Sequence, residues 1–74
     1  MAIVRRLDHL VLLRDGLHKD VDCTYSVVTD EQGKRCLQLD TYGSRERKMP
    51  GKKSQSIRFS PEAIEQLKNI LADL

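Results

Sequence analysis

Cationic side chains gather in one short window of this 74-residue chain. The window holds six of them between positions 45 and 58, against Glu46 as its one anion, so it carries +5 while the rest of the chain carries −3. Phosphate backbones need several positive groups along a path, which Lys and Arg supply without fixed spacing. The window therefore indicates an anion-binding surface, with nucleic acid as the usual ligand. A solvated loop with clustered charges is the alternative interpretation.

Tyr42 stands just before this window and offers a ring face on which an unpaired base can stack. The alternative role for Tyr42 is to cover the edge of a sheet. The predicted nucleic-acid-binding residues are Tyr42, Arg45, Arg47, Lys48, Lys52, Lys53 and Arg58.

Residues typical of catalysis form no recognisable pattern. The four glycines are scattered, so no phosphate-binding loop is present. The candidate metal ligands are His9, His18, Cys23 and Cys36, but only His18 and Cys23 are close, whereas structural zinc sites usually bring two closely spaced pairs. A Cys–His nucleophile pair can be drawn in any small protein with two of each. We expect a binding protein that is not an enzyme, with no cofactor and no metal.

The first residues and the length of the chain bear on its cellular compartment and its oligomeric state. Residues 1–13 are too short and too charged for an export signal or a membrane span. We therefore expect a cytoplasmic protein, without membrane association, whose Cys23 and Cys36 are reduced thiols. Residues 1–74 form one domain with a thin core, and such chains often gain stability from a partner subunit. A homodimer is the expected form.

The C-terminal segment 61–74 has the features of a capped amphipathic helix. Ser60 can accept from free N–H groups of the first turn, and Pro61 follows where a missing N–H costs nothing. Apolar residues then recur at helical spacing. They are Ile64, Leu67, Ile70, Leu71 and Leu74.

Residues 21–59 are predicted to form antiparallel strands. Val21–Val28 is rich in Val, Thr and Tyr, Asp30–Gly33 suits a turn with Gly33 at positive φ, and Lys34–Tyr42 alternates as a second strand. Residues 43–53 are predicted to be a loop, and Gln55–Phe59 alternates as a short strand. Along the second strand, one predicted face carries Cys36, Gln38, Asp40 and Tyr42.

The first twenty residues allow two interpretations. The apolar residues from Ile3 to Val11 fit a helix closed by Gly16, yet His9–Leu13 could be a strand. We favour a strand over part of Val4–Leu13.

Four segments of the chain resemble a known protein family. They are the predicted hairpin from Thr24 to Asp40 and the runs Lys48–Lys53, Ser56–Glu62 and Gln66–Lys68. They are similar to the C-terminal domain of the transcriptional coactivator family called positive cofactor four, over about residues 21–71. Ser56 stands where that family usually has glycine, and the first twenty residues have no counterpart.

The resemblance implies an α+β fold: a curved antiparallel sheet followed by one C-terminal helix, in a homodimer. It also implies binding of single-stranded DNA along basic strands. The function we expect is binding of single-stranded DNA, or RNA, in transcription or DNA maintenance. Lys48, Lys52, Lys53 and Arg58 match the family's basic loop and strand. The alternative function is a small dimeric protein–protein interaction module or accessory subunit.

Overall fold

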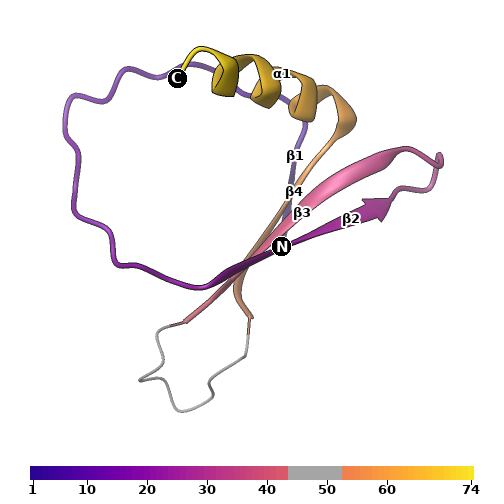
Figure 1. The fold of residues 1–74 in the computed structure, drawn as a ribbon, viewed down its shortest axis with the longest axis horizontal. Helices are drawn as coiled ribbons and strands as arrows, with labels where there is room; N and C mark the ends of the chain where they lie inside the picture. The colour runs from indigo at the N-terminus through magenta and orange to yellow at the C-terminus, as the bar shows by residue number, and fades with distance from the viewer. Residues whose placement is uncertain (44–52) are drawn as a thin grey trace.

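Four strands form one sheet, and a single helix follows them (Figure 1). The computed structural model describes residues 1–43 and 53–74, and the sheet order is β1-β4-β3-β2. The elements are β1 (Ala2–Val4), β2 (Cys23–Thr29), β3 (Arg35–Tyr42), β4 (Lys53–Phe59) and α1 (Pro61–Ala72). The predicted α+β class, with one C-terminal helix after the strands, is confirmed.

The hairpin of β2 and β3 forms where the turn residues predict it. Gly33 has a φ of 78°, a conformation that glycine adopts without steric cost. The carboxylate of Asp30 accepts the backbone N–H groups of Gln32 at 2.9 Å and Lys34 at 2.8 Å. These bonds close the turn and set the register in which Thr29 faces Arg35.

The register between β3 and β4 separates an apolar from a polar face of the sheet. Leu37 pairs with Phe59 and Leu39 with Ile57, so these side chains share one face. On the other face Gln38 pairs with Arg58, and Asp40 pairs with Ser56. We call this second side the polar face; Thr24 of β2 lies on it opposite Asp40.

The helix begins at the predicted residue. Ser60 has an extended backbone conformation, and its hydroxyl accepts the N–H of Ala63 at 3.2 Å. Pro61 occupies the first helical position. The helix ends at Ala72, two residues before the predicted end, because the N–H of Asp73 turns back to the carbonyl of Ile70 at 3.2 Å.

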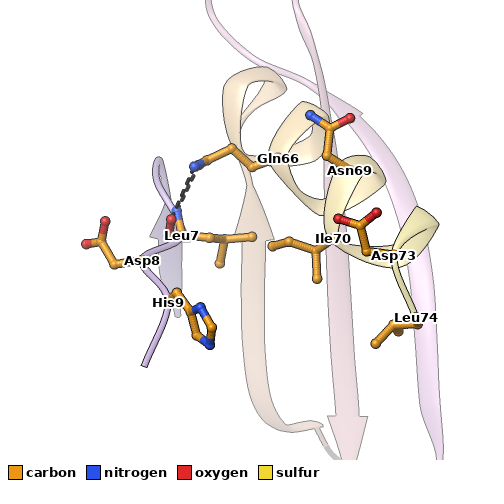
Figure 2. A pocket seen from close by; sticks show the side chains of 8 residues that line it. All are labelled: Leu7, Asp8, His9, Gln66, Asn69, Ile70, Asp73 and Leu74. Carbon is orange, nitrogen blue, oxygen red and sulfur yellow. Dashed lines mark hydrogen bonds between the residues drawn. The ribbon is translucent and has the colours of Figure 1, made fainter. Parts of the chain in front are cut away.

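Two predictions about the N-terminal part of the sheet are wrong. The strand lies at Ala2–Val4 and pairs in parallel with β4, so the sheet is mixed and not wholly antiparallel. Of the predicted range Val4–Leu13 only Val4 is in a strand, and residues 5–22 form neither helix nor strand. The chain leaves the sheet after Val4. Three residues further on, the N–H and carbonyl of Leu7 bond the side chain of Gln66 on α1 (Figure 2).

The buried part of the described chain is small, and three of its five residues are polar. Cys36 and Ala63 are the buried hydrophobic residues among those described, and Gln38, Asp40 and Ser60 are buried beside them. Cys23 is exposed, and both cysteines are free thiols. No helix in residues 1–43 and 53–74 is long and apolar enough to cross a membrane.

Candidate nucleic-acid interface

Three of the seven predicted binding residues lie in the described part of the chain, and all three come from β3 and β4. Tyr42 ends β3, Lys53 begins β4 and Arg58 lies near the end of β4. The other four, Arg45, Arg47, Lys48 and Lys52, lie outside the described residues. β3 therefore ends just before the cationic window, and β4 holds the last two cations of that window, Lys53 and Arg58.

Arg58 is held against the neighbouring strand by Gln38. Its Nε and Nη2 atoms both donate to Gln38 Oε1, at 3.1 Å and 2.6 Å. Two of the five N–H groups of the guanidinium are thus used, and the others have no partner among residues 1–43 and 53–74. Arg58 is half-buried and is oriented by Gln38, and no carboxylate in residues 1–43 and 53–74 forms an ion pair with it.

Asp40 is the acidic centre of the polar face. Its side chain is only 4% exposed and accepts from three neighbours. Gln38 Nε2 donates to both carboxylate oxygens at 3.2 Å, and Ser56 Oγ donates to Oδ1. Lys53 Nζ lies 3.3 Å from Oδ2. A buried carboxylate is costly unless it is hydrogen-bonded and paired, and Asp40 meets both conditions.

These partners explain the acidity of Asp40. The hydroxyl of Ser56, and then the amide of Gln38 and the ammonium of Lys53, hold the pKa of Asp40 below its ordinary value, although burial opposes them. Asp40 is therefore ionised at neutral pH. Its charge offsets that of Lys53, so Lys53 is a weaker attractor of phosphate than a free lysine.

Tyr42 lies at the edge of the same network. Its hydroxyl is 3.0 Å from Thr24 Oγ1 on β2, and its backbone N–H donates to the carbonyl of Asp22 at 2.9 Å. The ring is thus tied at its polar tip and is neither buried nor fully exposed. The predicted stacking role and the alternative role at the edge of the sheet are both compatible with this position.

Sequence reasoning missed the residues that position the two cations. Gln38, Asp40 and Ser56 were not among the predicted site residues, although the alternation of β3 already placed Gln38 and Asp40 on the face of Tyr42. The missing information was the register of β4, which brings Arg58 opposite Gln38 and Ser56 opposite Asp40.

The arrangement has the positive charge needed to bind an anion. Arg58, Lys53 and Asp40 give the polar face one net positive charge from the described residues, and the sequence adds four more cations between β3 and β4. In the described ranges, no three His, Cys, Asp or Glu side chains are grouped to hold a metal ion.

Comparisons with protein-family models, with curated proteins and with solved structures found no significant match to this chain.

Proposed function

We propose that this protein binds single-stranded nucleic acid along the polar face of β3 and β4 and the other cationic residues of the window, which follow β3. The observation that carries the proposal is the position of Arg58, oriented by Gln38 on the strand that holds the last two cations of the window. An oriented guanidinium with unused N–H groups suits a phosphate oxygen. The resemblance to the coactivator family points to the same ligand.

In this mechanism the affinity comes mainly from phosphate contacts. Arg58 supplies a fixed cation, and Lys53 supplies a second whose charge Asp40 partly offsets. Arg45, Arg47, Lys48 and Lys52 add charge from the window. Such contacts release counterions and carry little sequence information, so binding is general and salt-dependent. Tyr42 adds a ring on which one base can stack.

The test is fluorescence anisotropy of a labelled single-stranded oligonucleotide, titrated at several salt concentrations. The variant K52Q/K53Q/R58Q removes three predicted phosphate contacts. Its plot of log affinity against log salt should flatten by about 2, because each single-strand contact contributes about 0.7 to the slope. A duplex of equal length, measured in parallel, should bind more weakly.

A matched control removes the same charge elsewhere. Lys19, Lys34 and Lys68 are exposed and lie outside the window, so K19Q/K34Q/K68Q changes the net charge equally. This control should keep the salt slope of the wild-type protein. Equal slopes for wild type and the window variant would show that the window does not contact phosphates.

A protein–protein interaction module is the second candidate function. It is supported by the large apolar side chains that are exposed near the start of the chain and at the end of α1. A pull-down with and without nuclease separates the two functions, because protein partners that survive nuclease treatment do not depend on bridging nucleic acid.

A further inference from the structure

Residues 8–21, which we call the arm, place apolar side chains in solvent. Leu10, Val11, Leu12, Leu13 and Leu17 are between 65% and 105% exposed. Four of them are consecutive in the sequence, so their side chains cannot all lie on one face of the arm and be buried against this chain. Single exposed apolar residues are common on proteins, whereas a contiguous set marks a surface that another molecule covers.

The arm is fixed at both ends but not between them. At its start, Leu7 is bonded through its N–H and carbonyl to Gln66, at 2.9 Å and 3.1 Å. At its far end, the carbonyl of Asp22 accepts the N–H of Tyr42 at 2.9 Å. Between these points the chain runs in a wide arc beside α1 and returns at the other end of the sheet (Figure 1).

The amount of exposed surface is too large for a protein of this size that folds alone. A folded monomer of this mass is expected to expose about 4,650 Å², whereas this chain exposes 6954 Å². Its radius of gyration is 14.6 Å, against about 11 Å for a compact chain of this length. The surplus of about 2,300 Å² exceeds the roughly 800 Å² that each partner buries in a standard interface.

Two further apolar surfaces are open to a partner. A groove of about 580 Å³ lies between the start of the arm and the end of α1, where Leu7 and Ile70 point toward one another (Figure 2). On the outer strand β2, Tyr25 and Val27 are exposed on the apolar face of the sheet.

We propose that a second copy of this chain covers the arm, and that each arm of the resulting homodimer embraces the other subunit. The core of one chain holds only Cys36 and Ala63 as buried hydrophobic residues in the described ranges, so the partner is needed for folding itself. A second copy is the partner that is present whenever the chain is made. In a two-fold dimer both arms are covered at once.

Charge argues against nucleic acid as the occupant of the arm. The arm and Asp22 carry four aspartates against Arg14 and Lys19, a net charge of −2. Phosphates are repelled there and attracted to the window of residues 45–58. The dimer proposal does not rest on nucleic-acid binding, and it is tested without nucleic acid.

Sedimentation equilibrium of the wild-type protein gives the first readout. The expected mass is twice 8.5 kDa at micromolar concentration. The second readout is isotope-filtered NMR of a mixture of labelled and unlabelled chains. Contacts between methyl groups of Leu10–Leu13 in one subunit and Ile70 or Val27 in the other are expected. A folded monomer, or a dimer without contacts from the arm, would overturn the proposal.

A pair of variants provides the matched control. L12S/L13S removes two apolar side chains of the arm, and H18S/K19S changes two polar ones in the same segment. The first variant should weaken dimerisation at least tenfold, and the second should leave the dissociation constant within twofold of wild type. Equal dissociation constants for the two variants would contradict a role for the apolar arm. If L12S/L13S does not fold, the NMR contacts of the wild-type protein still decide.

Discussion

Arg58 and Gln38 form a fixed cross-strand pair, in which two N–H groups of the guanidinium donate to one amide oxygen at 3.1 Å and 2.6 Å. The amide nitrogen of Gln38 donates in turn to Asp40. Gln38 thus separates a cation from an anion on neighbouring strands and orients both. Its own charge is zero, so its contribution to ligand binding can be separated from that of Arg58.

The first prediction compares Q38L with R58Q. In Q38L the charge of Arg58 remains but its orientation is lost, so affinity for single-stranded DNA should fall while the salt slope stays at the wild-type value. In R58Q affinity should fall and the slope should flatten by about 0.7, since one phosphate contact is removed. Anisotropy titrations at several salt concentrations measure both quantities. A slope that flattens equally in the two variants would contradict a positioning role for Gln38.

Q38L should also reduce stability, because Arg58 and Asp40 both lose a partner. Leaving buried polar groups unsatisfied costs about 1–3 kcal/mol. Urea unfolding at one fixed protein concentration measures the loss, because the stability of the proposed dimer would depend on concentration. S54A, on an exposed position of β4, is the control and should unfold as wild type does.

The second prediction concerns the charge of Asp40. In D40N the shape of the side chain is kept, but Lys53 is no longer offset by a carboxylate at 3.3 Å. Affinity for single-stranded DNA should therefore rise and the salt slope should become steeper, although the folded state loses its bonds to the carboxylate. The same titration checks this, and the variant K68Q, on the exposed face of α1, should change neither quantity. Weaker binding by a folded D40N protein would mean that Asp40 supports the binding surface in another way.

The elements that were predicted correctly have local signals. The turn at Asp30–Gly33 depends on one glycine and one aspartate, and the start of α1 depends on Ser60 and Pro61. Each of these residues acts on neighbours within four positions. Sequence order alone is therefore enough to predict the hairpin and the helix start.

The short strand β1 has no such signal. Ala2–Val4 pairs in parallel with residues 57–59, more than fifty positions away, and three residues are too few for a recognisable alternation. The longer apolar run at Leu10–Leu13 is more suggestive of a strand, yet it is unpaired in this chain. If a second copy covers the arm, the reason for that apolar run lies in an assembly and not in the fold of one chain.

The sequence predicted the cations of the candidate site but not the residues that surround them. Lys53 and Arg58 were recognised by charge, whereas the offset of Lys53 by Asp40 depends on a register shift near Tyr42 that composition does not reveal. Buried polar positions such as Gln38 become informative only once the strand opposite is known.

The third prediction is a loss of stability in acid. The pKa of Asp40 is lowered chiefly by Ser56, and the pKa of Glu62 is lowered chiefly by its own backbone N–H and then by Ser60. A carboxyl whose pKa is lower in the folded state stabilises that state fully above its unfolded pKa, and this stabilisation is lost as the pH falls through the folded pKa.

The loss should begin as the pH falls toward 4.5 and 3.8, the ordinary values for Glu and Asp. Urea unfolding between pH 7 and pH 3 measures it. E62Q removes one of the two groups, so its stability should depend less on pH than that of the wild-type protein, and E65Q, on an exposed turn of α1, is the control. A wild-type stability that is constant over this range would contradict the prediction.

The fourth prediction separates the effect of backbone conformation from the effect of steric contact at two glycines. Apart from the glycine and its two chain neighbours, no described heavy atom lies within 4 Å of the position that a Cβ would take at Gly33 or Gly16, so alanine meets no steric contact there from the described residues. Gly33 has a φ of 78°, and among the described residues it is the glycine with positive φ. G33A should therefore lower the free energy of unfolding by about 1–2 kcal/mol, the cost of a left-handed L-residue. G16A should be neutral or stabilise by up to about 1 kcal/mol, because alanine has fewer conformations to lose. Parallel urea titrations compare the two variants at one protein concentration. If G33A is as stable as G16A, the turn must accept another backbone conformation, and the register of β2 with β3 would then be set by the bonds of Asp30 alone.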